Sequence, residues 1–408
     1  MIQALFRSLR HRNFRLFWSG QLVSLVGTWM QNVGQAWLVL ELTHSSLKLG
    51  VVSALQFAPM LFLSLFTGPF IDYFDKRRII IWTQAALMVQ AFVLSLLVVA
   101  GAAQYWHIVV LALLLGIVNT IDMPARQAFI IEMVGKEDLM NAIALNSSIF
   151  NAARAIGPAL AGMLIAAMGT AACFFINGLS FLAVLAGLLF MTVETASNKK
   201  KPAFHVLRDT REALEYIKTT PPVLITLMLV SVISIFGTNF NVLVPVFAKM
   251  ELGLDAAAFG FLLSAFGAGA LIGAFSLAWL SKYGPRPAFL FGGGISLSFF
   301  LILIGAQKSY GLTALLLALA GWSMVTFFGM ANTTVQLNTE DRLRGRVMSI
   351  YTLAFGGFTP FGSLFAGAVA HWIKAPATFA LGGLICGIVF IAALPKLKGS
   401  RGGKPSAR

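Results

Sequence analysis

The sequence predicts an all-α membrane protein with twelve transmembrane helices, arranged as two pseudo-symmetric bundles of six. Of the 408 residues, 58% are hydrophobic and only 11% are charged, against about 25% in an ordinary soluble domain. The apolar residues also form long runs, and about 20 apolar residues in a row are what a helix needs to cross a bilayer. These observations exclude a soluble enzyme, a disordered chain and a disulfide scaffold.

Six apolar runs of spanning length occupy the first half of the chain. Arginines precede the first run, as in a signal peptide. That run is too long and lacks a convincing cleavage site, so we expect an uncleaved first span. Proline and polar residues inside the fourth and fifth runs are tolerated where neighbouring helices satisfy the backbone. The predicted spans cover residues 16–40, 49–71, 79–101, 108–130, 142–168 and 171–193.

Six further runs occupy the second half, and the ninth and twelfth runs of the whole chain are short. Proline and polar residues also occur in the eleventh run. The predicted spans cover residues 223–247, 259–280, 288–305, 312–335, 347–372 and 378–394.

The longest polar stretch separates the two halves. Within it, Phe204, Leu207, Leu214 and Ile217 keep to one helix face, which predicts a short amphipathic helix on the membrane surface. The predicted parts are a six-helix bundle at 1–193, the linker at 194–222, a second six-helix bundle at 223–395 and a basic cytoplasmic tail at 396–408.

The loop charges predict the orientation of the spans. With both chain ends on one side, 25 of the 30 Lys and Arg residues lie on that side and four on the other, while Arg154 falls inside a span. Basic residues accumulate in cytoplasmic loops. We therefore expect a multi-pass protein of the cytoplasmic (inner) membrane with both termini cytoplasmic. Because the net charge of +15 is spread over these loops, no nucleic-acid partner is expected.

The two halves are weakly similar to each other. Glu137 and Asp138 precede span five, and Glu340 and Asp341 precede span eleven at an offset of 203 residues. Paired six-span halves are typical of transporters, whose sites lie between the halves near the middle of the membrane.

Four charged groups near or inside spans one, four and five are candidates for proton coupling, namely Asp122, Arg126, Arg154 and Glu41. Asp122 lies about 14 residues, or roughly 21 Å, into span four, and Arg126 is four residues further on, where the two can pair. Asp122 is interpreted either as a carboxylate that titrates during transport or as half of a permanent ion pair. Glu41, at the outer end of span one, is either a proton-uptake group or an interfacial carboxylate.

Arg154 is the most deeply placed charge. It lies about 12 residues, or roughly 18 Å, into span five, where insertion of a charge costs about 2.5–3.5 kcal/mol. Ser147, Asn151 and Arg154 share one helix face. Either Arg154 lines a cavity, where it binds an anionic substrate group or shifts the acidity of a partner, or it is a structural residue bound to backbone carbonyls.

Polar residues form stripes along several spans. A polar stripe facing lipid would be costly, so these residues are expected to line a cavity or to form a hydrogen-bonded seam between helices. The cavity-lining candidates are Ser24, Thr28, Trp29, Gln31 and Gln35 in span one, Asn151 in span five, Ser234, Thr238 and Asn241 in span seven, and Asn332 in span ten.

The loop between spans two and three carries a signature. Residues 68–78 resemble the motif G-x-x-x-D-R-x-G-R-R of the major facilitator superfamily. The resemblance implies a cytoplasmic gate, in which an Asp accepts hydrogen bonds at the N-terminus of span eleven. Glu132 is expected to pair with one of the arginines, and the alternative is a loop that is basic for topology alone. The gate candidates are Gly68, Asp72, Arg77, Arg78 and Glu132, whereas Tyr73 and Asp75 depart from the motif.

Further segments resemble the drug:proton antiporter branch of this superfamily, which contains enterobactin exporters and macrolide-efflux proteins. The segments are 122–128, 141–147, 150–162 and 344–349, and the similarity runs to about residue 395. Gly157, Pro158 and Gly162 resemble the span-five motif G-x-x-x-G-P-x-x-G-G, in which Ala153 and Ala161 replace two glycines. Simple close packing of small residues is the alternative.

The resemblance implies the major facilitator fold and alternating access, with export driven by proton uptake. We expect a secondary active transporter that exports a drug-like molecule or a siderophore. A lysolipid or amphiphile transporter and an uncoupled facilitator are the alternatives. The expected partners are a small-molecule substrate, protons and the lipid bilayer, and a monomer is expected.

No catalytic residue, metal site or cofactor is expected. The sequence has no G-x-x-x-x-G-K-[ST] segment for ATP and no H-E-x-x-H metal motif. Cys173 and Cys386 lie far apart within apolar runs, as small core residues do. ATP-driven pumping and enzymatic activity are therefore disfavoured.

Overall fold

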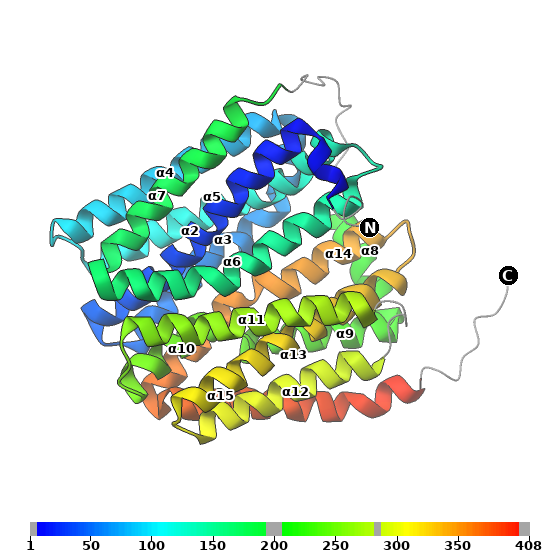
Figure 1. Cartoon of the computed structure of the whole chain (residues 1–408). Coiled ribbons are helices and arrows are strands. Elements are labelled where there is room, and N and C mark those ends of the chain that lie inside the picture. Colours follow the sequence, from blue (N-terminus) through cyan, green and yellow to red (C-terminus); the bar gives the residue numbers. More distant parts are fainter. Residues whose placement is uncertain (1–5, 193–205, 281–286, 400–408) are drawn as a thin grey trace.

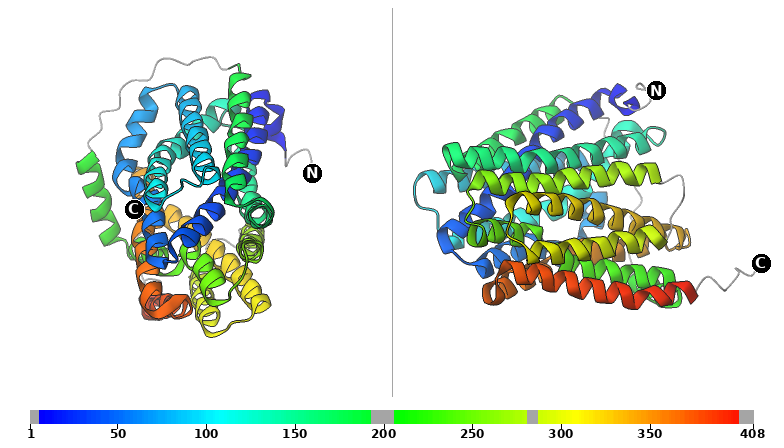
Figure 2. Two further views of the ribbon diagram at one scale, coloured as in Figure 1. Left: turned by 90° about the vertical axis from the view of Figure 1, so that its left-hand side faces the viewer. Right: turned by 60° about the horizontal axis from the view of Figure 1, so that its bottom comes forward.

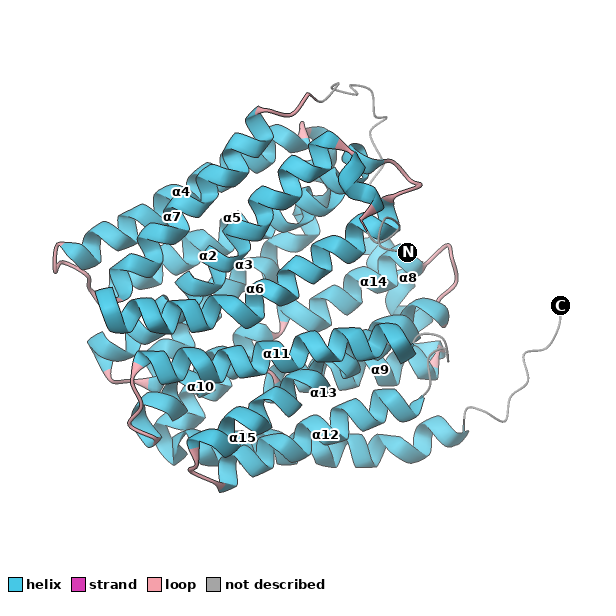
Figure 3. Cartoon of the chain, viewed as in Figure 1, coloured by secondary structure: helices cyan, strands magenta, loops and turns pink. Residues whose placement is uncertain are grey.

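The computed structural model describes residues 6–192, 206–280 and 287–399. Within these ranges every regular element is a helix (Figure 3). Ten stretches of them are long and apolar enough to cross a membrane. The chain is accordingly an all-helical protein of the multi-pass membrane class.

The first group of helices follows a short 3-10 turn, η1 (Arg7–Arg10). Side-chain caps begin two of them: Ser45 accepts a hydrogen bond from the backbone of Lys48, and Asp75 accepts one from the backbone of Arg78. The helices are α2 (Arg12–Thr43), α3 (Ser46–Tyr73), α4 (Lys76–Val99), α5 (Tyr105–Val134), α6 (Leu139–Met168) and α7 (Thr170–Leu189).

The second group begins with the linker helix α8 (Val206–Thr219). Its members are α9 (Pro221–Val232), the π-helical turn η2 (Ile233–Gly237), α10 (Phe240–Val246), the π-helical turn η3 (Phe247–Glu251), α11 (Ala256–Leu280), α12 (Pro287–Ala306), α13 (Tyr310–Leu337), α14 (Arg344–Thr352), the π-helical turn η5 (Leu353–Gly357) and α15 (Thr359–Gly399).

Two predicted spans are interrupted in the structure. The seventh contains the wide turn η2 and the eleventh contains η5, each at a glycine-bearing sequence that loosens the regular helix. The stretch Arg344–Pro395 is 52 residues long, and its backbone leaves helical geometry at Lys374 (φ 68°). This break falls between the predicted spans eleven and twelve.

The two groups lie one above the other in Figure 1, with α2 to α7 above and α9 to α15 below. Within the first group α2 packs on α6 and α7, and within the second α11 packs on α13 and α12 on α15. The groups meet where α6 lies along α11 and α3 along α15, and both views in Figure 2 keep α6 beside α11. These two helix pairs form the seam between the groups.

The molecule has two opposite ends, called here the terminal end and the distal end. The terminal end carries η1, α8 and the turns at Gly135 and Asn338, on the right in Figure 1. The distal end carries the turns at His44, Gly169 and Lys374. The helices of both groups run between these two ends.

The linker helix packs on the second group. Ala213 and Ile217 are buried, and the Tyr216 hydroxyl donates to the carbonyl of Asn338 at 2.9 Å. Ile217 thus lies on an inward face, whereas Leu214, predicted on the same face, is exposed. The buried face is shifted because α8 packs on the turn after α13 and on α9 and α14. Phe204 and the side chain of Leu207 lie outside the described residues.

Candidate functional site

Asp122 is fully buried in the first group. One carboxylate oxygen accepts hydrogen bonds from Thr83 Oγ1 at 2.6 Å and from Gln84 Nε2 at 3.0 Å. The other oxygen forms an ion pair with Arg126 at 2.6 Å, so the predicted pairing along α5 is confirmed. A carboxylate in apolar surroundings needs such partners, because an uncompensated buried charge is expensive.

Arg126 joins this ion pair to α2 and to a polar cavity. Its guanidinium donates to Gln21 Oε1 at 2.5 Å. It also lines an internal cavity of about 40 Å³, which has room for water. Polar residues from α2, α5 and α7 line the same cavity, among them Ser24, Thr28, Gln31, Asn119 and Asn177. Polar side chains and room for a water molecule therefore lie beside the guanidinium that pairs with Asp122.

The polar stripe of α2 also forms a hydrogen-bonded seam with other helices of the first group. Gln31 donates to Gln90 at 2.8 Å and accepts from Asn177 at 2.6 Å. Gln35 donates to Gln56 at 3.1 Å. Both interpretations weighed from the sequence apply, since Gln35 belongs to the seam while Gln31 belongs to the seam and to the cavity.

Arg154 lies on α6 among aromatic rings. Its guanidinium carbon is 5.4 Å from the centre of the Trp29 ring and 5.0 Å from that of Phe150. The Nε atom is buried and has no hydrogen-bond partner. Asn151, one turn nearer the terminal end, is half-buried and donates to the carbonyl of Ser147. Trp29 and Asn151 therefore accompany Arg154.

The polar candidates of the second group do not gather around one point. Ser234 is buried in η2, and Thr238 donates to its carbonyl at 3.3 Å. Asn241 is exposed, and Asn332 on α13 accepts from Gln336 at 2.6 Å. No hydrogen bond between described residues links these four side chains to the stripe on α2.

The span-five motif brings α6 close to two neighbours. A Cβ atom on Gly157 would lie 2.6 Å from the Cβ of Trp29 on α2. One on Gly162 would lie 2.6 Å from the carbonyl oxygen of Ala256, and one on Gly260 of α11 only 2.4 Å from the carbonyl of Pro158. Small residues therefore let α6 touch α2 and α11 together.

The predicted gate loop is organised differently from the expectation. Glu132 forms its ion pair with Lys76 at 2.6 Å, not with Arg77 or Arg78. Arg77 instead donates to the carbonyl of Leu188 at 2.8 Å, at the C-terminal end of α7. The expected partner was wrong because Lys76 begins α4 with its side chain buried toward α5, which turns Arg77 toward α7.

The structure describes few contacts of the remaining gate candidates. Arg78 is exposed, and its backbone N–H donates to the side chain of the capping residue Asp75. Gly68 and Asp72 belong to α3, but the surroundings of Gly68 and the side chain of Asp72 lie outside the described part of the structure.

Glu41 takes part in a contact between the groups at the distal end. It accepts from Trp37 Nε1 at 2.7 Å and lies 3.9 Å from the ammonium of Lys249. Lys249 also sits 4.3 Å from the centre of the Trp37 ring, and that ring stacks on Phe259 of α11 at 5.5 Å. The contact joins α2 of the first group to η3 and α11 of the second.

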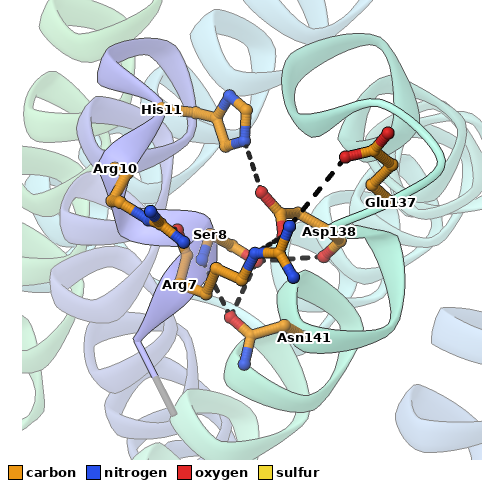
Figure 4. Close-up of polar contacts among 7 residues, drawn as sticks. All are labelled: Arg7, Ser8, Arg10, His11, Glu137, Asp138 and Asn141. Atoms are coloured by element: carbon orange, nitrogen blue, oxygen red, sulfur yellow. Dashed lines mark hydrogen bonds and ion pairs between the residues drawn. The ribbon is translucent and has the colours of Figure 1, made fainter. Parts of the chain in front are cut away.

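At the terminal end, η1 docks on the start of α6 (Figure 4). Asp138 pairs with Arg7 at 2.7 Å and with His11 at 2.8 Å. Ser8 is fully buried, and its hydroxyl donates to Asn141 at 2.8 Å. The hydrogen bond from His11 and the positive charge of Arg7 hold the pKa of Asp138 below its ordinary value.

Four residues of these sites were not predicted from the sequence, because they contact their partners from other helices. Thr83 and Gln84 around Asp122 are polar residues inside an apolar run, and that signal could have found them. Lys249 and Phe259 at the distal contact carry no local signal, since a lysine at a helix end is ordinary.

Long apolar helices in two groups, with buried charges and polar seams inside, define a membrane transporter. The chain matches the family described as transmembrane secretion effectors over residues 3–400. It belongs to this family, which is part of the major facilitator superfamily.

Characterised relatives share the full length of the chain. It is 26% identical to the staphyloferrin A transporter of Staphylococcus aureus (strain NCTC 8325 / PS 47) over 91% of this chain and 92% of that one. It is 26% identical to the multidrug efflux pump Tap of Mycolicibacterium fortuitum (92% and 94%). It is 23% identical to the enterobactin exporter EntS of Escherichia coli O81 (strain ED1a) (95% and 93%).

Solved structures show the same fold at low identity. The nucleoside transporter NupG superimposes with a TM-score of 0.69 at 13% identity, covering 97% of this chain and 99% of that one. A bacterial homolog of the human lysosomal transporter Spinster, solved inward-facing and unoccupied, has a TM-score of 0.72 at 14% identity (94% and 95%). The fold is therefore that of the major facilitator transporters.

Proposed function

We propose that this transporter exports a drug-like molecule or a siderophore in exchange for protons. The names of the relatives, a staphyloferrin A transporter, a multidrug efflux pump and an enterobactin exporter, support the substrate class. The observation that carries proton coupling is the pair of buried Asp122 and half-buried Arg126 beside a polar cavity. Intramembrane charges of this kind are expensive, and they mark ion pathways in transporters.

The architecture in the membrane is part of this proposal. We count twelve spans, taking α2 as the first and dividing the stretch Arg344–Pro395 at Lys374. The two bundles cover 1–193 and 223–395, the linker covers 194–222, and the tail covers 396–408. The terminal end faces the cytoplasm across the inner membrane, with both termini there, and the transporter acts as a monomer.

In this mechanism Asp122 changes charge during the cycle. As a carboxylate it holds Arg126, Thr83 and Gln84 together and so ties α4 to α5. A proton on the oxygen facing Arg126 removes the ion pair and leaves the guanidinium to Gln21 and the cavity. Protonation thus releases Arg126 from the carboxylate while keeping its hydrogen bond to Gln21 of α2, and it removes the negative charge that strengthens the hydrogen bonds from α4. The residues 68–78, with Arg77, Arg78 and Glu132, serve as the cytoplasmic gate.

The test uses purified protein in liposomes with an internal pH dye and a panel of siderophores, macrolides and cationic dyes. We expect one compound to trigger proton movement in the wild type and none in Asp122→Asn, while that variant still binds the compound. Thr83→Val is the matched control, because it removes one hydrogen bond and leaves the ion pair. Uphill transport at full rate by Asp122→Asn would refute the coupling role, and compound flux without protons would indicate a facilitator.

A groove on the side of the first group favours a second candidate function, transport of a lysolipid or another amphiphile. The groove has a volume of about 610 Å³ between α2, α6 and α7, and its lining is apolar, including Val26, Leu160, Leu164 and Leu179. A groove of this kind fits an acyl chain. Transfer of a fluorescent lysolipid across the liposome membrane, slowed by Leu160→Trp, would support it.

A further inference from the structure

Arg154 carries a permanent charge that the protein leaves without a counterion. A guanidinium does not lose its proton in proteins. Among the described residues no carboxylate lies within 4 Å of it and none accepts a hydrogen bond from it. Its Nε is buried with its donor unused. The sequence-based alternative, a structural arginine bound to backbone carbonyls, therefore lacks the contacts that it requires.

Another half-buried arginine inside a helix of the first group shows what a satisfied site looks like. Arg126 has Asp122 at 2.6 Å and Gln21 at 2.5 Å. Among the described residues, the guanidinium of Arg154 contacts two aromatic faces, those of Trp29 and Phe150, and no carboxylate. Cation–π contacts are worth about 0.5–2 kcal/mol, which is less than the cost of placing a charge in the membrane. The rings hold the guanidinium in place but do not neutralise it.

The position of Arg154 is where the two groups meet. A Cβ on Gly267 of α11 would lie 2.4 Å from the carbonyl oxygen of Arg154 and 2.7 Å from the Cα of Ala155. Gly157, on the next turn, touches α2. The helix face that carries Arg154 continues toward the terminal end through half-buried Asn151 and exposed Ser147. A polar track therefore leads to the guanidinium along the seam.

We propose that Arg154, framed by Trp29 and Phe150, binds the carboxylate of the transported substrate, so that the substrates are organic anions with an aromatic or other flat apolar portion. This rests on the proposed export function and names its substrate class. The guanidinium presents a planar fork that matches a carboxylate with two parallel hydrogen bonds. The two rings offer flat apolar surface beside that fork. The bound carboxylate supplies the missing negative charge. The two helix groups can then close around a carboxylate–guanidinium pair that has no net charge.

The test compares two probes of one shape, 2-naphthoate and its neutral amide 2-naphthamide, for binding to the purified full-length protein in detergent at pH 7. We expect the wild type to bind the carboxylate about tenfold more tightly than the amide. In Arg154→Gln this ratio falls to about one, with amide binding unchanged, which also shows that the variant is folded. Arg154→Lys retains part of the ratio, because it keeps the charge and loses the fork. Arg15→Gln, at an exposed arginine on α2, leaves it unaltered.

A wild type without preference for the carboxylate, including one that binds neither probe, overturns the proposal. So does an unchanged ratio in Arg154→Gln. The measurement uses no proton gradient, so a failure of proton coupling is seen separately in liposomes. Asp122→Asn is expected to keep the tenfold ratio even where it has lost coupled transport.

Discussion

The two ends of the seam between the helix groups are built from different interactions. At the distal end the contacts cross from one group to the other. Ser53 of α3 and Ser363 of α15 share a hydrogen bond of 2.9 Å, and a Cβ on Gly50 would lie 2.8 Å from the Cα of Gly367. At the terminal end, each ion pair between described residues stays within one group or joins α8 to the second.

Several ion pairs at the terminal end are shorter than the pair at the distal end, although Arg7 and Glu137 are also 3.9 Å apart. Lys76 and Glu132 lie 2.6 Å apart, as do Arg342 and Glu212, and the hydrogen bond from Arg342 lowers the pKa of Glu212. The ion pair across the distal end, between Glu41 and Lys249, is 3.9 Å long. Short pairs therefore lie within a group or between α8 and the second group. In the proposed alternating-access cycle, the groups separate where the contacts are the longer Glu41–Lys249 pair and small residues.

The distal end is closed by glycine and serine contacts between α3 and α15 and between α6 and α11. In the proposed orientation, with alternating access, such contacts are expected of a state that is closed on the outer side.

The largest effect is expected from locking the distal end. Ser53→Cys with Ser363→Cys, in a chain with Cys173→Ala and Cys386→Ala, places two thiols where the hydroxyls are 2.9 Å apart, within reach of a disulfide. Oxidation should abolish transport, and reduction should restore it, as measured by substrate flux in liposomes. The matched control pairs Ser296→Cys with Ser323→Cys, whose hydroxyls are also 2.9 Å apart but lie within the second group. If oxidation of the distal pair leaves transport intact, that end does not open.

A smaller, opposite effect is expected from forcing the distal end apart. Gly260→Val puts side-chain atoms against the carbonyl of Pro158, where even a Cβ would be only 2.4 Å away. The distal end should open, which raises the labelling rate of a cysteine at Ser53 severalfold. Gly292→Val is the control, because a Cβ there meets nothing within 4 Å. Equal labelling in the two variants would contradict the role of α6 and α11 in closing this end.

Among these contacts, those that depend on local spacing along a helix could be predicted from the sequence. Asp122 and Arg126 are one helical turn apart, so their pairing follows from α-helical geometry alone. Glu132 and Lys76 are 56 residues apart, and the choice of Lys76 over Arg77 depends on how α4 packs on α5. The distal contact of Glu41 with Lys249 joins the two groups, and local periodicity carries no information about that distance.

A modest effect is expected at Lys249. Replacing it with Gln removes the ion pair with Glu41 and the cation over Trp37, while leaving the stack of Trp37 on Phe259. Partly exposed pairs and cation–π contacts contribute about 0.5–1 kcal/mol each, so the distal labelling rate should rise less than in Gly260→Val. Lys249→Arg keeps both contacts and serves as the control. A larger rise than in Gly260→Val would reverse the ranking of the two kinds of contact.

The smallest effect concerns the terminal end, and it depends on pH. The pKa of Asp138 is lowered in the folded protein by the hydrogen bond from His11, with Arg7 and Arg10 adding positive charge. A lowered pKa means that the docking of η1 is stabilised above the ordinary pKa of an aspartate, about 3.9, and that this stabilisation is lost as pH falls through the folded value. Relative to an exposed cysteine labelled at the same pH, a cysteine at the buried Ser8 should therefore label slowly at pH 7 and faster below about pH 4. Asp138→Asn should label fast at both pH values, because the amide carries no charge for Arg7. Since η1 and α6 belong to the same group, transport at pH 7 should change little in that variant, and a complete loss of transport would show that this ion pair takes part in the separation of the groups after all.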